Sequence, residues 1–218
     1  MIHLFLKLII SELNDYLESV SQGEGPFTVA GNVGLASVFG GNGSYMENRV
    51  VASLINLAEE PTLKNKSQYK TNSISWEKSF PTVYLNAFIL FSANFNSSSP
   101  NSGSENNYTS GIERLSQVIG FFQGKSSFKV SSFPTPNFAI NDANPDPDLL
   151  EFQNCEFKLE IVSLTFEQCN HLWGSLGGKQ LPFILYKAQI IPITRRKVID
   201  GGGVIKEIET RLNNLSNT

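Results

Sequence analysis

Charged side chains are scarce in this chain of 218 residues, where Asp, Glu, Lys and Arg account for only 17% of the sequence. Average globular proteins carry roughly 25%. Polar uncharged residues replace the missing charges, which fits either a surface partly covered by partners or an Asn-rich genome. The net charge is −3, and the Lys and Arg residues are scattered. Because nucleic-acid binding needs a basic stripe that matches the phosphate backbone, we expect no nucleic-acid partner.

Cysteine and histidine are also rare, with two of each in the chain. Cys155 and Cys169 are too few for a disulfide framework, and we expect both to be reduced thiols. Cys169 and His171 lie two residues apart on a predicted helix and point away from each other, so they do not form a zinc site. We expect His171 to be packed or hydrogen-bonded. With His3 as the other histidine and no Gly-x-Ser-x-Gly motif, the sequence predicts no catalytic, metal-binding or cofactor-binding residue.

The segment Gly124–Lys125–Ser126 looks like the end of a phosphate-binding loop. That motif requires four residues after its first glycine, whereas only three separate Gly120 from Gly124. It also requires a helix to follow, because the phosphate binds at the helix N-terminus. Here the segment follows a predicted helix, so we interpret it as a helix C-terminal cap.

Long hydrophobic runs are missing as well. No stretch of about 20 apolar residues occurs, so no transmembrane helix is expected. The first ten residues, MIHLFLKLII, are apolar, but Lys7 interrupts them and no small-residue cleavage site follows. We interpret them as the start of an amphipathic helix and expect a soluble protein made in the cytoplasm.

Periodicity predicts three helices and six strands. Helices are expected at 2–21, 108–123 and 165–176, and strands at 27–39, 48–59, 81–95, 126–133, 155–164 and 181–198. The strand at 48–59 is apolar on both faces and is expected at the centre of a sheet. The segments 60–80, 96–107 and 134–147 are polar or proline-rich and are interpreted as irregular connections. Strands and helices do not alternate strictly, which predicts an α+β fold with a mixed, mainly antiparallel β-sheet and helices packed on it.

Four local signals refine these expectations. Thr165 and Gln168 have the spacing of a capping box at the start of the third helix. Trp173, on that helix, is expected in or near the core. Pro192 requires its strand to be bulged or at an edge of the sheet. Gly201–Gly203 are expected to act as a hinge, which divides the chain into a domain at 1–200 and a tail or arm at 201–218.

Several segments together resemble one protein family. They are ENRVVASLINLAEEPTLKN (47–65), PTVYLNAFILFSANF (81–95), LSQVIGFFQGKS (115–126), FEQCNHLWGSLGGKQLPFILYKAQIIPI (166–193) and the start, IHLFLKLIISELNDYL. This set is similar to the tail-terminator or cap proteins of extracellular contractile injection systems, which are phage-tail-like particles. The resemblance extends from about residue 2 to about residue 193. It does not include the Asn-rich segment 96–107 or the last 25 or so residues.

The resemblance implies a non-enzymatic structural protein with a tail-terminator-like fold. It would form a ring of six copies on the baseplate-distal end of the inner tube, and would contact the tube protein and the contractile sheath protein. Assembly would take place in the bacterial cytoplasm, and the particle would be released or membrane-anchored. Two alternatives remain: a baseplate or adaptor subunit of the same particle, and an enzyme or ligand-binding protein with an unrecognised site.

Two groups of residues are candidate contacts in such an assembly. Phe121 and Phe122 are adjacent at a helix end, so we expect that they cannot both face one core: either one serves an interface, or both are buried against different elements. Near the C-terminus, a basic cluster precedes a segment with apolar residues at helical spacing, which fits either a solvated strand end followed by a frayed helix or an arm that docks on an acidic partner surface. The residues predicted for this arm contact are Arg195, Arg196, Lys197, Ile205 and Ile208.

Overall fold

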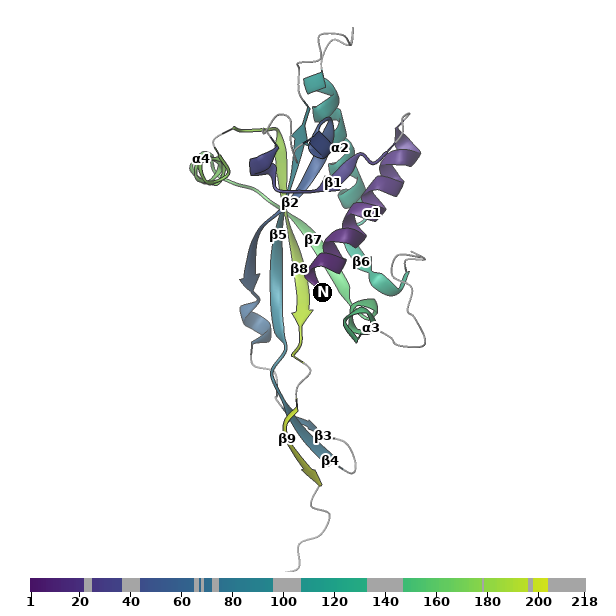
Figure 1. Ribbon diagram of the computed structural model, residues 1–218, viewed down its shortest axis with the longest axis vertical. Coiled ribbons are helices and arrows are strands. Elements are labelled where there is room, and N and C mark those ends of the chain that lie inside the picture. Colours follow the sequence, from purple (N-terminus) through teal and green to yellow (C-terminus); the bar gives the residue numbers. More distant parts are fainter. Residues whose placement is uncertain are drawn as a thin grey trace, which may run out of the picture.

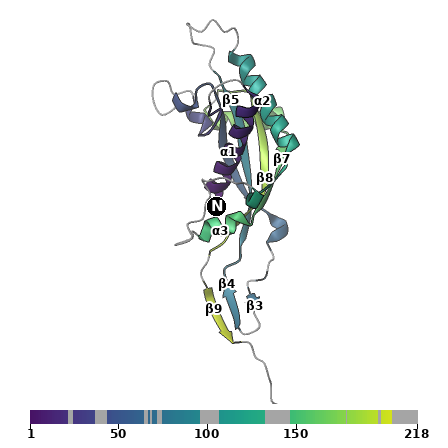
Figure 2. The same ribbon diagram turned by 90° about the vertical axis from the view of Figure 1, so that its right-hand side faces the viewer.

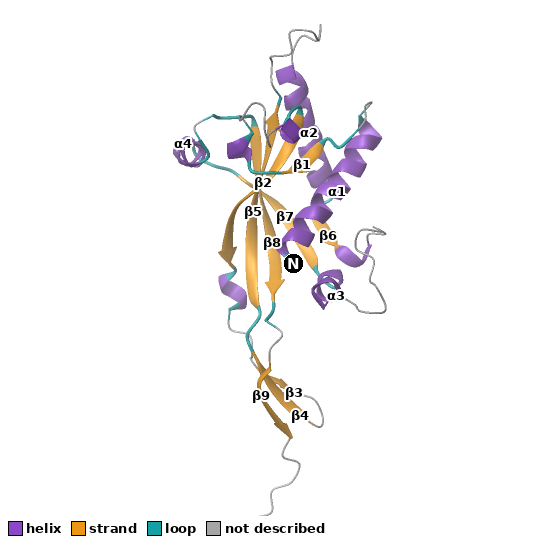
Figure 3. Ribbon diagram, in the orientation of Figure 1, coloured by secondary structure: helices purple, strands orange, loops and turns teal. Residues whose placement is uncertain are grey.

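A six-stranded sheet forms the body of the molecule (Figures 1 and 3). The computed structural model describes residues 1–21, 25–36, 44–64, 67, 69–71, 75–95, 107–132, 147–177, 179–195 and 198–203. The strand order is β1-β2-β5-β8-β7-β6. Strands β1 and β2 are parallel, and the other neighbours are antiparallel. The predicted fold class, a mixed and mainly antiparallel sheet with packed helices, is confirmed.

The strands of this sheet are β1 (Thr28–Ala30), β2 (Arg49–Glu59), β5 (Val83–Asn94), β6 (Ser127–Lys129), β7 (Glu156–Val162) and β8 (Phe183–Ile193). The helices are α1 (Ile2–Val20), α2 (Asn107–Gly124), α3 (Pro147–Gln153) and α4 (Phe166–Ser175). Short 3-10 turns are η1 (Val33–Leu35), η2 (Ser44–Met46), η3 (Pro61–Leu63) and η4 (Val130–Ser132). No described helix is both long enough and apolar enough to cross a membrane.

Helices α1 and α2 cover one face of the sheet and enclose the main core (Figures 1 and 2). The amphipathic pattern of α1 explains its place, because its apolar stripe is buried against the sheet: Phe5, Leu8, Ile9, Leu13 and Leu17. Burial of one such side chain stabilises the fold by roughly 1.5–3 kcal/mol. The helix predicted at 2–21 is therefore confirmed, together with the reason for it.

A second, smaller core lies on the opposite face. Trp173 from α4, Val33 from η1 and Met46 from η2 pack there against the sheet. Helix α4 begins as predicted: Thr165 Oγ1 accepts a hydrogen bond from Gln168 N at 3.2 Å, and Gln168 Oε1 accepts one from Thr165 N at 2.9 Å. The predicted capping box and the burial of Trp173 are both confirmed.

A separate three-stranded sheet, with the order β3-β4-β9, projects from one end of the body (Figures 1 and 2). Its strands are β3 (Tyr69–Thr71), β4 (Ser75–Ser79) and β9 (Val198–Gly203). The prediction of an irregular connection at 60–80 is wrong for the residues that form β3 and β4. The glycine hinge is wrong as well, because Gly201–Gly203 are extended and pair with Ser75–Glu77 of β4. The boundary proposed between residues 200 and 201 thus falls inside a strand.

Other differences concern the length of elements. The strand predicted at 27–39 ends at Ala30, because Asn32 turns the chain and its side chain accepts a hydrogen bond from Gly34 N at the start of η1. The strand predicted at 126–133 has three residues, and helix α3 was not predicted. Residues 96–106 and 133–146, which hold most of two predicted connections, lie outside the described residues.

Pro192 occupies the position that proline requires. Strand β8 lies between β5 and β7, but β7 pairs with it only as far as Gln189. A register shift in the β5–β8 pairing, between Leu85 and Ala87, lies next to this point. Pro192 is therefore beyond the last pair with β7 and beside a bulge, where its missing N–H costs no ladder hydrogen bond.

Candidate assembly surfaces

The histidine and cysteine side chains considered for catalysis or metal binding are either exposed or part of the packed structure. His171 is exposed, with Nε2 3.8 Å from Glu167 Oε1, which is beyond hydrogen-bond distance, so the expectation of a packed or hydrogen-bonded histidine is wrong. Within the described ranges, no three His, Cys, Asp or Glu side chains gather as metal ligands. Burial, and secondarily the carboxylate of Glu151, raises the pKa of the Cys155 thiol to about 11. Cys155 Sγ donates to the backbone oxygen of Glu151, so this thiol is protonated and structural at neutral pH.

Lys125 follows the last turn of α2, as the cap interpretation of Gly124–Lys125–Ser126 requires. Its N–H donates to Phe121 O at 2.9 Å, and its Nζ lies 2.9 Å from Glu12 Oε2 on α1. The ammonium therefore links the two helices of the main core and is not directed at a phosphate.

Phe121 and Phe122 both belong to the main core, with 8% and 2% of their surface exposed. Their ring centroids are 5.1 Å apart, and both rings contact Phe128 of β6. Phe121 also contacts Tyr16 of α1, whereas Phe122 contacts Phe91 and Tyr186 of the sheet. The expectation that they cannot both face one core is wrong, because α1 and the sheet converge on the end of α2 from two sides.

Arg195 lies at the junction between the body and the small sheet. Its guanidinium is 4.6 Å from the ring centroid of Phe80, the residue that follows β4. Beside this pair, the hydroxyl oxygens of Thr82 and Thr194 are 3.1 Å apart. Arg195 is exposed and thus available to a partner while it stacks on Phe80. The other predicted arm contacts lie outside the described residues: Arg196, Lys197, Ile205 and Ile208.

Strand β2 changes from an interior strand to an edge strand along its length. Its first half is flanked by β1 and β5, but the pairing with β1 ends at Ala52. Beyond that point β5 is the one strand of the described chain that pairs with β2, and Leu54 and Leu57 are 39% and 37% exposed. The central position predicted for 48–59 therefore holds for the first half alone.

A second open edge lies at the end of β7. Strand β6 pairs with β7 up to Lys158, and Leu159 N donates to Ser126 O just beyond. No described strand flanks the outer side of residues 160–162. Because backbone groups two residues apart in a strand point to the same edge, the N–H and C=O of Ile161 face this open side. The Ile161 side chain is 55% exposed.

A groove of about 490 Å³ adjoins this edge, between α2 and the sheet. Its lining is mainly apolar: Ile119, Phe122, Gln123, Ser126, Leu159, Glu160, Ile161 and Tyr186. The hydroxyl of Tyr186 is buried and has no hydrogen-bond partner among the described residues. Burial raises the pKa of this phenol to about 12, so the group remains a neutral donor. The groove thus combines an exposed apolar side chain with an open strand edge.

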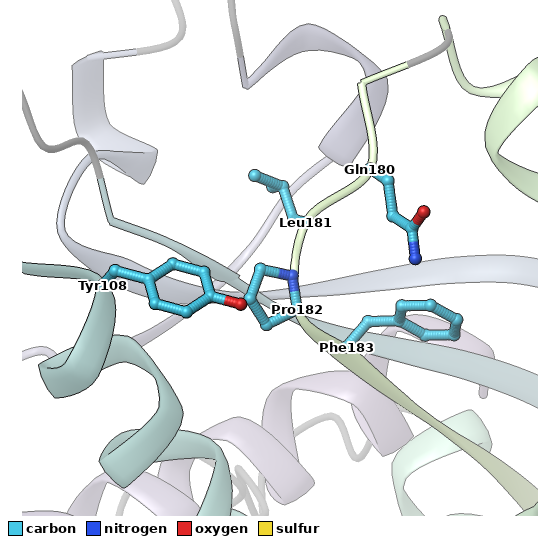
Figure 4. Close-up of a pocket in the computed structure, with 5 residues that line it drawn as sticks. All are labelled: Tyr108, Gln180, Leu181, Pro182 and Phe183. Atoms are coloured by element: carbon cyan, nitrogen blue, oxygen red, sulfur yellow. The ribbon is translucent and has the colours of Figure 1, made fainter.

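A second hollow, of about 380 Å³, lies near the start of α2 (Figure 4). Tyr108, Gln180, Leu181, Pro182 and Phe183 line it. Figure 4 shows the Tyr108 hydroxyl directed at Pro182, while the Gln180 amide extends to the other side, beside Phe183. These polar groups do not converge on one point, so they do not form the constellation expected of a ligand site.

The sequence did not single out Ile161, Leu54 or Leu57 as surface residues. Each is an apolar residue in a predicted strand, where the sequence pattern predicts burial. Their side chains are exposed because no described strand flanks this part of β2 or β7, and not because of the residue type. The sequence carried no signal for this, because the flanking strands β1 and β6 have three residues each, whereas the segments 27–39 and 126–133 were predicted to be strands throughout.

Comparison with known families gives a match over most of the chain. The family model described as the Pvc16 N-terminal domain matches residues 6–207. The curated proteins contain no significant match to this chain.

Two solved structures share the fold. One is the sheath/tube terminator of an extracellular contractile injection system (PVC) in its extended state, at 10% sequence identity and a TM-score of 0.54. The alignment covers 97% of this chain and 64% of that one. The other is the tube-terminating cap of the anti-feeding prophage, at 14% identity and a TM-score of 0.50, covering 75% of this chain and 49% of that one. The chain therefore spans less than two thirds of the length of either matched protein.

Proposed function

The chain belongs to the Pvc16 N-terminal domain family, and from this premise we propose that it is a structural subunit that terminates the tube and sheath of a contractile, phage-tail-like injection particle. One observation carries the proposal: the family match from residue 6 to 207 coincides with a fold shared with a sheath/tube terminator over 97% of the chain. The role is one of assembly rather than catalysis. The subunit would be assembled in the bacterial cytoplasm and become part of an extracellular particle.

The assembled form is a closed homo-oligomeric ring, most simply a hexamer. A ring of identical subunits needs a head-to-tail contact between two different surfaces of the chain. The groove beside Ile161 supports such a contact, because a neighbour would cover the exposed side chain and pair with the open edge of β7.

The small sheet and the residues that follow it are the proposed contact with the inner tube and the sheath. The small sheet projects beyond the helices (Figure 2), so it can reach a neighbouring layer of the particle. Arg195 is exposed where it joins the body, and with Arg196 and Lys197 it offers positive charge to an acidic partner surface. The apolar residues Ile205 and Ile208 would dock beside it. The proposed arm therefore begins after β9, at residue 204, rather than at a glycine hinge.

The test is co-expression of the chain with tube and sheath subunits, followed by electron microscopy of labelled particles. The proposal expects the label at the baseplate-distal end, and tubes of uncontrolled length when the chain is omitted. A label at the baseplate would support the adaptor alternative and overturn the cap.

A truncation tests the arm separately. Removal of residues 204–218 leaves β9 in place, whereas a cut at residue 200 would remove half of that strand. Truncated caps should fold and bind the tube but release the sheath end. Truncated caps that hold the sheath like the full chain would show that the arm has no such role.

A further inference from the structure

Two asparagine side chains make hydrogen bonds to backbone groups along one edge of the large sheet. This edge is formed by β1 and the second half of β2. Asn14 of α1 donates from Nδ2 to Thr28 O at 2.9 Å and accepts on Oδ1 from Thr28 N at 2.7 Å. Asn56 of β2 accepts on Oδ1 from Leu57 N at 2.9 Å. A carboxamide carries the same donor and acceptor as a peptide group, so each side chain stands where an added strand would bind.

The direction of the backbone groups establishes that these are edge positions. In β1, Phe27 O accepts from Val50 N and Gly31 N donates to Ala52 O, so both groups point to β2. Backbone groups alternate in direction along a strand, so the N–H and C=O of Thr28 and Ala30 point outward. β1 thus has two outward-facing residues, Thr28 and Ala30. Asn14 hydrogen-bonds to both the N–H and the C=O of Thr28.

The same reasoning applies to β2. Glu60 N donates to Tyr84 O of the β5 side, so residues 58 and 60 face β5. The pairing is regular from Leu57 to Glu59, so Leu57 and Glu59 face the open edge. The outward N–H of Leu57 is the one that Asn56 occupies.

We propose that Asn14 and Asn56 close the β1–β2 edge against strand addition and so restrict which surface of the subunit joins copies together. Open edges are templates for edge-to-edge association of identical chains. The residues Leu54 and Leu57 make this edge apolar, which would favour such association if the backbone were free. The edge at Ile161 has no comparable closure among the described residues, so strand addition is directed there. The inference concerns self-association and does not depend on the cap role.

The test compares the full chain with Asn14→Ala, Asn56→Ala and the double variant. Ser53→Ala is the matched control. Ser53 Oγ also makes two hydrogen bonds to backbone groups, because it donates to Gly31 O at 2.7 Å and accepts from Val33 N at 3.1 Å. These bonds do not lie at the open edge of the sheet. Sedimentation velocity over a concentration series measures mass, and amide hydrogen exchange measures protection of Thr28 and Leu57.

The proposal expects the double variant to form species larger than the wild-type assembly as concentration rises, while Ser53→Ala does not. In dilute Asn14→Ala, exchange at Thr28 should accelerate roughly tenfold, which corresponds to the loss of one or two hydrogen bonds. A folded double variant with the wild-type mass distribution at every concentration overturns the proposal. If Asn14→Ala does not fold, Asn14→Asp keeps the acceptor for Thr28 N but repels Thr28 O, and should associate. Failure of both to fold, with a folded Ser53→Ala, would assign Asn14 to folding and also overturn the proposal.

Discussion

The side-chain amide of Asn86 donates a hydrogen bond to the carboxylate of Glu60, with Nδ2 2.7 Å from Oε2. Thr62 donates to the other carboxylate oxygen through its hydroxyl at 2.6 Å and its N–H at 3.3 Å. The pair connects buried Asn86 of β5 to the residue that follows β2 and caps η3. Hydrogen-bond donors favour the ionised carboxylate, so they lower the pKa of Glu60 from 4.5 to about 2. The bond from Asn86 has the largest effect, followed by those from Thr62.

Acid should therefore weaken the fold at this point. A carboxyl group whose pKa is lowered by folding stabilises the protein above its unfolded pKa, and this contribution disappears as pH falls through the folded pKa. For Glu60 the loss falls between about pH 4.5 and pH 2. Glu60→Gln keeps an acceptor but removes the titration, so its melting temperature should decline less than that of the wild type over this range. Parallel declines would show that Glu60 carries no linked stability.

Removal of the capping box should destabilise α4. Thr165→Ala deletes the acceptor for Gln168 N and frees a helix N–H, which costs about 1 kcal/mol of unfolding free energy, within a range of about 0.5–2. Denaturant titration followed by the fluorescence of Trp173, in a Trp76→Phe background, measures the change. Ser175→Ala is the control, because its hydroxyl donates to Leu172 O in the last turn and caps nothing at the start. Equal small losses in both would contradict the capping role.

The small sheet should depend on the absence of a side chain at residue 202. Gly202 pairs with Trp76, and a Cβ at this position would lie 3.2 Å from Trp76 Nε1. Gly202→Val should therefore displace the indole from Tyr69, its neighbour at 6.1 Å, and shift Trp76 emission to longer wavelength in a Trp173→Phe background. Gly203→Val meets no atom within 4 Å and serves as the control. Unchanged emission in Gly202→Val would refute the packing argument.

Ring formation should be sensitive to charge at the β7 groove. Ile161 is exposed in the free subunit, so Ile161→Asp should fold with a melting temperature close to wild type. In an interface the same carboxylate would be buried without a partner, which costs several kcal/mol and prevents ring closure. Light scattering and negative-stain imaging measure the outcome. Phe166→Asp, at a side chain that is 92% exposed and outside the groove, is the matched control. If the Ile161→Asp variant forms rings like the wild type, this groove is not part of the interface between subunits.

The sequence predicts elements that bury an apolar pattern and fails on elements that do not. Helix α1, strand β5 and helix α4 were located because their apolar periodicity or capping residues are local properties. The small sheet was missed because none of the described helices covers it, so its strands need no alternation of apolar and polar residues. Strand β9 reads Val-Ile-Asp-Gly-Gly-Gly, which resembles a linker, and becomes a strand because β4 is available to pair with it.

The candidate surface was predicted less well than the fold. Phe121 and Phe122 were expected at an interface from their adjacency, but α1 and the sheet reach both rings. Exposure at Ile161 and the hydrogen bonds of Asn14 depend on which strands end early and on where α1 crosses β1. These are relations between segments distant in the chain, and no local pattern encodes them.

The attachment of the small sheet determines how the subunit carries mechanical load. Strand β4 leads through residues 80–82 into β5, and β8 leads through residues 194–197 into β9, so two short links enter two neighbouring interior strands of the body. Tension applied at the far end of β9 passes along that strand into β8, because the two strands follow each other in the chain. The pairs of β9 with β4 run from Ser79–Val198 beside the body to Ser75–Gly203 at the far end, so they lie alongside this path and do not interrupt it. In the body, the pull along β8 acts on its antiparallel ladder with β5, where many hydrogen bonds are loaded together in shear rather than one after another.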